Sequence, residues 1–496
     1  MVLLGVVVLG CLLRLWTLTA LPLIETDGVR YVEIARQFQR SGSPFDPLFH
    51  PLYPLCIGAL QPFVGDWEFT GRLVSTLFGT AVILPTYGLT RMLLDRSAAV
   101  ITALLVAVHP GLVRSSASVL SEPLYTFLLV VGVWVGWRGL VATPALLAVS
   151  GALFGLAYLV RPEAVLYVVG LSALASIAGV RAGRMREKLL WAGAALALFL
   201  VLAGPYLVYL RGTLGHWTLS GKIIHNLVLD VSVPASGQGD LAFVARHAGM
   251  LARRLAENVF LFEKYALGEL FPGVSILFLL PGILARGRES SWLTREGLLL
   301  ALALPPVATL AFHVDSRVFL PSLPFLLPFL ASGIVGVATW LSSARHRRWC
   351  LSGLVLVVVA GLAPYTLRPA LRPEPGEAVY RRVAQWVAAS QPAGTAVMDR
   401  KPFVAFYSGR RFTPLVPVAP AELTWALVMA STKRLPQYIG NLKHGAWQQS
   451  GMKTASMPPN FGRGTVLRER TMMIFGYGRI GQIVSTYARA FGMRVL

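Results

Sequence analysis

Apolar runs of about 20 residues recur along most of this chain, and each is long enough to cross the hydrocarbon core of a bilayer. Only 14% of the 496 residues are charged, whereas a soluble domain carries about a quarter. A soluble globular fold is therefore excluded, and the pattern predicts an α-helical polytopic membrane protein with about eleven spans. The predicted spans cover residues 2–23, 70–91, 98–113, 119–137, 143–160, 163–180, 189–210, 269–285, 296–312, 318–341 and 349–367.

Basic residues gather in alternate loops between these spans. They are Arg91, Arg96, Arg138 and those of 181–188, 286–288 and 345–348. The positive-inside rule places these loops in the cytoplasm, so the loops 24–69, 114–118, 161–163, 211–268 and 313–317 and the tail after Leu367 face outward. The same rule explains the net charge of +22 without a nucleic-acid partner. We predict a protein of the plasma (inner) membrane whose active site faces the extracytoplasmic side.

The first outward loop contains an amphipathic segment from Val29 to Phe38, where apolar residues recur at helical spacing. We expect this helix to lie on the membrane surface, with its polar face toward water. Asp27 stands just before it, where a carboxylate can either cap the helix or act as a general base. The proline-rich stretch 51–64 is too short for a span and is interpreted as re-entrant or interfacial.

Ionisable residues near membrane level all fall on the predicted outward side. Groups at this depth are costly and usually functional, although each one alone could extend from a loop end into water. Their placement on a single side indicates a functional site there. They are Asp27, Glu122, Arg161, Glu163, Asp315 and Arg317.

Six segments in sequence carry a resemblance to a known family. They read TDGVRYVEIA, FHPLYPL, GRLVSTLFG, SSASVLSEPLYTFLL, GLAYLVRPEAVLY and DSRVFLPSLPFLLPFL. In this order and spacing they resemble the GT-C membrane glycosyltransferases, in the branch with protein O-mannosyltransferases, aminoarabinose transferases of lipid A and RgtA/B/C/D-like enzymes. The resemblance covers residues 1 to about 420 and implies a GT-C fold.

The resemblance also implies roles for individual residues. Asp27 matches the catalytic base of the first outward loop, although relatives often carry two adjacent acidic residues where this chain has Asp27-Gly28. Glu122 matches a second acidic position, which helps to place the acceptor or a cation. The residues expected to bind the lipid-phosphate donor are Arg161, Arg317, Arg72, Arg30 and His50.

The implied reaction moves a sugar from a polyprenyl-phosphate donor to an acceptor hydroxyl, with inversion at the anomeric carbon. Arginines suit a phosphate leaving group because they stay charged and match its oxygens, and a carboxylate can take the hydroxyl proton. The long loop 211–268 carries further basic residues and is expected to close over the phosphate; they are Lys222, His225, Arg246, Arg253 and Arg254.

The metal requirement, the sugar and the acceptor are left open by the sequence. His50, His313 and Asp315 are possible ligands for a divalent cation, but they lack a close pair at ligand spacing, so no metal site is assigned. The expected partners are the lipid bilayer, the polyprenyl-linked donor and a glycan, lipid or protein acceptor. A multi-span transporter or flippase of a lipid-linked substrate is the alternative, although no internal repeat supports it.

The polar C-terminal region divides into two further parts beyond the membrane domain 1–367. Residues 368–418 read as a small outward α/β piece, with an amphipathic helix before a strand at 396–398. Residues 419–496 resemble D-isomer-specific 2-hydroxyacid dehydrogenases, in which Gly476, Gly478 and Gly481 form a dinucleotide fingerprint between a strand and a helix. The acidic ribose-binding residue expected about 20 positions later is missing. We therefore expect an incomplete Rossmann-like, non-functional NAD motif from a fusion or artefact joined near 415–422, rather than a working dehydrogenase.

Overall fold

The computed structural model describes residues 1–181, 183–222, 248–262, 267–287, 295–306, 310, 316–371, 375–399, 401–414, 418–436, 438–439 and 464–496. Contacts between residues divide this chain into two compact units, Met1–Val379 and Tyr380–Leu496. The predicted helical membrane protein is confirmed in the first unit. The three-part division of the sequence stays a prediction, and the last helix of the first unit extends past the predicted domain end at residue 367.

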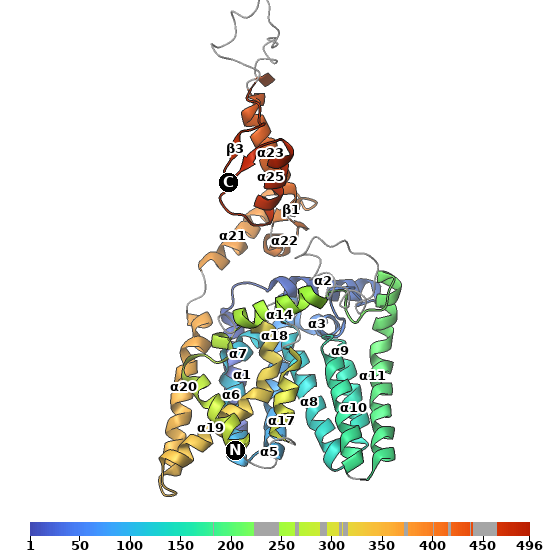
Figure 1. Cartoon of the computed structure of the whole chain (residues 1–496), viewed down its shortest axis with the longest axis vertical. Helices are drawn as coiled ribbons and strands as arrows, with labels where there is room; N and C mark the ends of the chain where they lie inside the picture. Colours follow the sequence, from blue (N-terminus) through green and yellow to red (C-terminus); the bar gives the residue numbers. More distant parts are fainter. Residues whose placement is uncertain are drawn as a thin grey trace, which may run out of the picture. The chain divides into compact units, whose positions relative to one another are not determined.

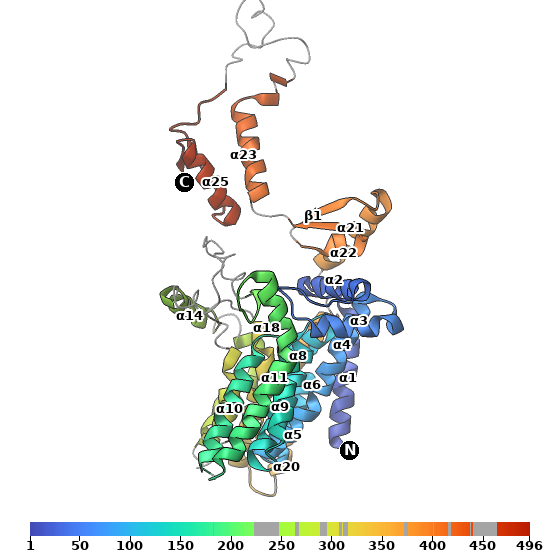
Figure 2. The same cartoon turned by 90° about the vertical axis from the view of Figure 1, so that its right-hand side faces the viewer.

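The first unit is a bundle of apolar helices, several of which lie side by side in both views (Figures 1 and 2). Within the described residues, seven helical stretches are long and apolar enough to span a membrane, or eight if one bent pair counts as a span. The bundle helices are α1 (Val2–Ala20), α4 (Trp67–Ala81), α5 (Ile83–Leu93), α6 (Arg96–Val108), α7 (Pro110–Ala117), α8 (Glu122–Val141), α9 (Leu146–Tyr158), α10 (Ala164–Arg181), α11 (Met185–Leu214), α16 (Leu279–Gly287), α17 (Glu296–Ala303), α19 (Leu323–Leu341) and α20 (Arg347–Leu371).

Each of the eleven predicted spans overlaps one or more of these helices, but the count of eleven stays a prediction. The predicted span 98–113 is divided by a 49° bend between α6 and α7. Pro110 opens α7 and His109 before it has an extended backbone, with φ −64° and ψ 125°. A residue before proline is pushed out of the helical region, so the bend lies where the sequence puts the proline.

Shorter elements cover one end of the bundle. The predicted helix of the first outward loop is confirmed as α2 (Thr26–Ser41), which lies across this end and ends where Gly42 adopts a left-handed backbone, with φ 74°. Its position on the membrane surface stays a prediction. The proline-rich stretch forms a helix, α3 (Leu52–Val64), packed against α2. The other short elements are α14 (Ala248–Phe262), α15 (Gly268–Leu270), η2 (Gly273–Phe278), α18 (Ser316–Phe319) and η4 (Leu320–Ser322).

The second unit contains two small α/β pieces, and α21 (Pro375–Ser390) crosses into it. In one piece, β1 (Ala396–Asp399) pairs in parallel with β2 (Arg411–Pro414), and Ala384 of α21 packs with Val404 of α22 (Phe403–Ser408). In the other, β3 (Thr471–Met472) pairs in parallel with β4 (Arg494–Val495) around α25 (Arg479–Ala490). Helix α23 (Val418–Thr432) packs on α25 through Trp425, whose ring lies 5.0 Å from that of Phe491. The predicted helix–strand order and the helix after the glycine motif are confirmed.

Candidate functional site

Five ionisable residues from different parts of the first unit form one continuous chain of ion pairs. Arg317 Nη2 lies 3.1 Å from both Asp27 Oδ2 and Glu122 Oε1. Arg161 Nη1 lies 3.3 Å from the same Glu122 oxygen, and Arg161 Nη2 lies 3.0 Å from Glu163 Oε1. We call this set, Asp27–Arg317–Glu122–Arg161–Glu163, the ion-pair chain. It unites the two predicted catalytic carboxylates with two of the predicted donor-binding arginines.

Each member of the ion-pair chain lies at the end of a helix or in the turn next to one, as its local sequence predicts. Asp27 lies in the first turn of α2, whose N-cap is Glu25, so Asp27 does not have the capping role that the sequence left open. Glu122 is the first residue of α8, where the helix dipole favours a negative charge. Arg161 and Glu163 flank Pro162 in the turn between α9 and α10. Arg317 lies in the short helix α18.

The members of the ion-pair chain differ in how far they are exposed. The side chains of Asp27 and Arg317 are about one-third exposed, at 34% and 35%. Glu122 is only 3% exposed, and its second oxygen, Oε2, is buried without a hydrogen-bond partner among the described residues. A buried acceptor without a donor is unfavourable, so Oε2 marks a position where a substrate or water hydroxyl would be stabilising.

Lys222 is one of the basic residues of the loop 211–268, and the sequence did not show which of them lies at the site. Its Nζ lies 3.6 Å above the Phe49 ring, and the preceding Gly221 is bonded through its N–H to the carbonyl of Pro47 in the first outward loop. Burial lowers the pKa of Lys222, and the charges of Asp27 and Glu122 oppose that shift. Lys222 therefore belongs to the same electrostatic centre, although almost 200 residues separate it from Asp27 in sequence.

The cations also set the protonation of the carboxyls. Burial raises the pKa of Asp27, but Lys222 and Arg317 outweigh this and hold it below the usual aspartate value. Glu163 is likewise buried, yet Arg161 keeps its pKa below the ordinary glutamate value. Both carboxylates are therefore ionised at neutral pH.

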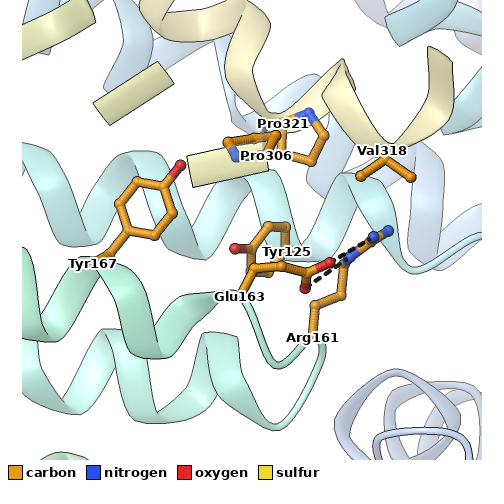
Figure 3. A pocket seen from close by; sticks show the side chains of 7 residues that line it. All are labelled: Tyr125, Arg161, Glu163, Tyr167, Pro306, Val318 and Pro321. Atoms are coloured by element: carbon orange, nitrogen blue, oxygen red, sulfur yellow. Dashed lines mark hydrogen bonds and ion pairs between the residues drawn. The ribbon is translucent and has the colours of Figure 1, made fainter. Parts of the chain in front are cut away.

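A small pocket adjoins the buried end of the ion-pair chain (Figure 3). Arg161 donates to both oxygens of Glu163, at 3.4 and 3.0 Å, and its guanidinium lies 5.7 Å from the centre of the Tyr125 ring. Tyr167, Pro306, Val318 and Pro321 complete a mostly apolar lining. The ion-pair chain is thus partly exposed at its Asp27–Arg317 end and adjoins a mostly apolar pocket at its Arg161–Glu163 end.

Arg72, another predicted donor-binding residue, lies in a different environment. Its guanidinium donates to the carbonyls of Leu18, Leu21 and Leu23, at 2.7 to 3.0 Å, and to Glu68 at 2.6 Å. These contacts satisfy the C-terminal end of α1. These contacts give Arg72 a structural role at the end of α1, and its predicted role as a phosphate ligand stays a prediction.

Arg30 and His50 are also not brought into the ion-pair chain. Arg30 pairs with Asp46 and Glu33 on the exposed side of α2. His50 is 5% exposed and its ring lies 5.1 Å from that of Tyr158 and 4.8 Å from that of Tyr206. Burial lowers the pKa of His50 to about 3, so it is neutral at physiological pH and cannot act as a cation toward phosphate.

The predicted metal candidates His313 and Asp315 lie outside the described residues, as do His225 and Arg246. In the described part of the chain, no three His, Cys, Asp or Glu side chains gather in a group that could hold a metal ion. In α14, Arg253 is 83% exposed and pairs with Glu257. Arg254 is the neighbouring residue on the same helix.

Comparisons with known proteins bear on the membrane unit first. A family model described as dolichyl-phosphate-mannose-protein mannosyltransferase matches residues 47–209. The crystal structure of ArnT from Cupriavidus metallidurans in the apo state has a TM-score of 0.57 at 14% identity, over 83% of this chain and 85% of that chain. The structure of the same protein bound to undecaprenyl phosphate gives 0.56 at 15% identity with the same coverage.

The apo structure of the Archaeoglobus fulgidus oligosaccharyltransferase has a TM-score of 0.50 at 14% identity, over 83% of this chain and 64% of that chain. At these identities the likeness establishes the fold and not the reaction. The predicted resemblance is confirmed: this chain is an integral membrane protein with the fold of the GT-C glycosyltransferases.

The C-terminal stretch matches a different family. A model described as the NAD binding domain of D-isomer specific 2-hydroxyacid dehydrogenases covers residues 425–496. The D-3-phosphoglycerate dehydrogenase of Methanocaldococcus jannaschii is 35% identical over 79 residues, which are 16% of this chain and 13% of that protein. The chain thus spans a small part of the length of this curated relative, and the second predicted resemblance is confirmed for this segment alone.

Proposed function

We propose that this protein transfers a sugar from a polyprenyl-phosphate donor to an acceptor hydroxyl, with inversion at the anomeric carbon. The observation that carries the proposal is the ion-pair chain, which places two arginines and two candidate catalytic carboxylates together in a GT-C fold. ArnT, which shares the fold, has been solved with undecaprenyl phosphate bound. The family model for dolichyl-phosphate-mannose transferases supports the same class of donor.

Arg317 is the proposed main contact of the donor phosphate. It is the more exposed of the two arginines, and its planar donors suit phosphate oxygens. Lys222 and Arg161 add further positive charge, which acts on Asp27. Together they would stabilise the charge that grows on the phosphate as the glycosidic bond breaks, so no general acid is needed.

Asp27 is the proposed base for the acceptor hydroxyl. While paired with Arg317 it is a weak base, because the arginine stabilises its charged form. A phosphate that engages Arg317 would weaken this hold and raise the basicity of Asp27 next to the reacting carbon. Glu122 holds the two arginines, and its free Oε2 is placed to accept a hydrogen bond from a substrate hydroxyl.

The first test is transfer by the purified protein in nanodiscs, supplied with undecaprenyl phosphate carrying single hexoses or pentoses. Release of undecaprenyl phosphate, with the sugar moved to an added membrane-glycan extract, is the expected result. Asp27→Asn should lower the rate by at least about 100-fold, because general-base catalysis contributes about 10²–10⁴. Glu33→Gln, an exposed carboxylate on the same helix, is the matched control and should keep the wild-type rate.

Full activity of folded Asp27→Asn would contradict the assignment of the base. The transporter alternative predicts a different outcome for the same preparation: flipping of a fluorescent polyprenyl phosphate in liposomes without release of sugar. We further propose, from the basic loops, that the ion-pair chain faces the extracytoplasmic side of the plasma membrane. Labelling of single cysteines placed in 24–69 and 345–348 from outside intact cells tests this orientation.

A further inference from the structure

The first turn of α2 makes an unusually close contact with the segment that leads into α8. A Cβ added at Gly28 would lie 2.8 Å from the backbone carbonyl oxygen of Val119 and 2.9 Å from its Cβ. The side chain of Ile24 would also lie 2.8 Å away. Because the nearest atoms include backbone, the clash could not be relieved by rotating a side chain. Only glycine therefore fits here without moving one of the two segments.

The segment that Gly28 meets is also held by α4. The side chain of Val119 packs against Gly71 of α4, where an added Cβ would lie 2.6 Å from Val119 Cγ1. Ser75 Oγ of the same helix donates to the carbonyl of Leu120 at 2.9 Å. Tyr31 of α2 itself donates to Ser121 Oγ at 2.9 Å, so α2 and this segment are also joined close to Gly28. A side chain at position 28 would consequently push α2 away from a segment that α4 holds in place.

This contact stands directly beside the ion-pair chain. Asp27 precedes Gly28, and Glu122 follows the segment 118–121 that Gly28 touches. Arg317 Nη2 lies 3.1 Å from an oxygen of each carboxylate, so a small displacement of either carboxylate would lengthen its ion pair with Arg317. An ordinary contact at position 28 needs at least 3.4 Å instead of 2.8 Å, so any side chain there would separate Asp27 from Arg317 or Glu122.

We infer that Gly28 is a positioning residue, which sets the spacing of Asp27 and Glu122 by letting the first turn of α2 rest on the Val119 carbonyl. This inference rests on the proposed function for its kinetic consequence, but its structural consequence stands alone. Position 28, next to Asp27, therefore has no room for a second acidic side chain. The site is therefore built around one first-loop carboxylate held at a fixed distance from Arg317.

The test compares Gly28→Ala with the wild type in nanodiscs. Alanine normally stabilises a helix relative to glycine, so a loss here cannot be assigned to helix propensity. With the undecaprenyl-phosphate sugar that the wild type uses, we expect kcat to fall about 100-fold while KM changes little, as for a catalytic group misplaced by about 1 Å. Gly193→Ala in α11, where no heavy atom lies within 4 Å of the added Cβ, should match the wild type.

Two readouts separate positioning from a general loss of stability. The acid limb of the pH profile of kcat/KM, which reports the free enzyme, should move to higher pH in Gly28→Ala, because Asp27 would lose part of its contact with Arg317 while Lys222 and Arg161 remain. Val119→Ala should restore the transfer rate of Gly71→Ala, whose added Cβ closely meets only side-chain atoms, those of Val119 at 2.6 and 3.1 Å, with Ile57 Cδ1 at an ordinary 3.4 Å. It should not restore the rate of Gly28→Ala, whose added Cβ meets the backbone of Val119. Restoration of both, or an unchanged acid limb, would overturn the inference.

A cryo-EM structure of Gly28→Ala gives an answer that does not depend on activity. We expect the Asp27 Oδ2–Arg317 Nη2 separation to exceed hydrogen-bond distance. Retention of the 3.1 Å contact would overturn the inference, whatever the enzyme does. If the wild type transfers no sugar from any donor, the proposed function fails while this structural comparison still decides the role of Gly28.

Discussion

Cations in the described part of the membrane unit contact two kinds of partner, and the kind of partner indicates the role of each cation. Arg161 and Arg317 contact the carboxylates of the ion-pair chain. Arg72, Arg14 and Lys188 instead donate to backbone carbonyls at helix ends: those near the end of α1, those of Val106 and Ala107 in α6, and those of Gly139 and Leu140 in α8. Such carbonyls lack partners within their own helix, and in lipid no water replaces them.

Arg72 therefore allows a direct test of these roles. Arg72→Met should destabilise the protein by about 3–5 kcal/mol, because it removes donors from the carbonyls of α1 and breaks the ion pair to the largely buried Glu68. The affinity for undecaprenyl phosphate should stay close to that of the wild type. Thermal unfolding in detergent and equilibrium binding measure the two quantities, and a large loss of affinity without loss of stability would restore Arg72 to the donor site.

At the scale of single elements, breaks in helices decide where polar groups collect. The bend at His109-Pro110 exposes carbonyls at the end of α6, and Arg14 of α1 reaches across to two of them, at 3.0 and 3.1 Å. Arg14 is fully buried within an apolar helix, a position that only such partners make tolerable. The turn between α9 and α10 and the short helix α18 similarly present Arg161 and Arg317 at helix ends.

The pairing of α1 with α6 predicts the effect of removing this arginine. Arg14→Leu should lower stability by about 2–6 kcal/mol, since two buried acceptors would lose their donors at about 1–3 kcal/mol each. Arg91→Leu, at an exposed position on α5, is the control and should have little effect. Unfolding midpoints of the two variants in the same detergent provide the comparison. Equal stability of Arg14→Leu and wild type would show that water or lipid headgroups satisfy these carbonyls.

At the scale of the whole molecule, the ion-pair chain lies entirely within the unit Met1–Val379. The dehydrogenase-like segment lies in the other unit and has its own small core around α23 and α25. In the part of this segment that the structure describes, β3 and β4 pair over two residues each, whereas dinucleotide-binding folds use an extended parallel sheet. All five members of the ion-pair chain come from the membrane unit.

Removal of residues 419–496 tests this independence. The shortened protein should keep its transfer rate within about twofold and bind undecaprenyl phosphate as the full chain does, because every member of the ion-pair chain belongs to the unit that remains. Expression level and monodispersity in detergent control for folding. A loss of transfer by a well-folded shortened protein would show that the tail contributes to the site.

The sequence by itself determined the class of protein, most of the helices and the candidates for the reactive side chains. These features depend on short stretches of sequence: the length of apolar runs, the positions of proline and glycine, and the placement of charges. Helices such as α2 and α25 could therefore be predicted from their own residues. The tertiary structure alone decided which cations share a site. Arg72 and Arg317 look alike in sequence, and they differ because folding brings backbone carbonyls to one and two carboxylates to the other. The close approach of Gly28 to Val119 is likewise a property of packing between distant segments, which no local pattern records.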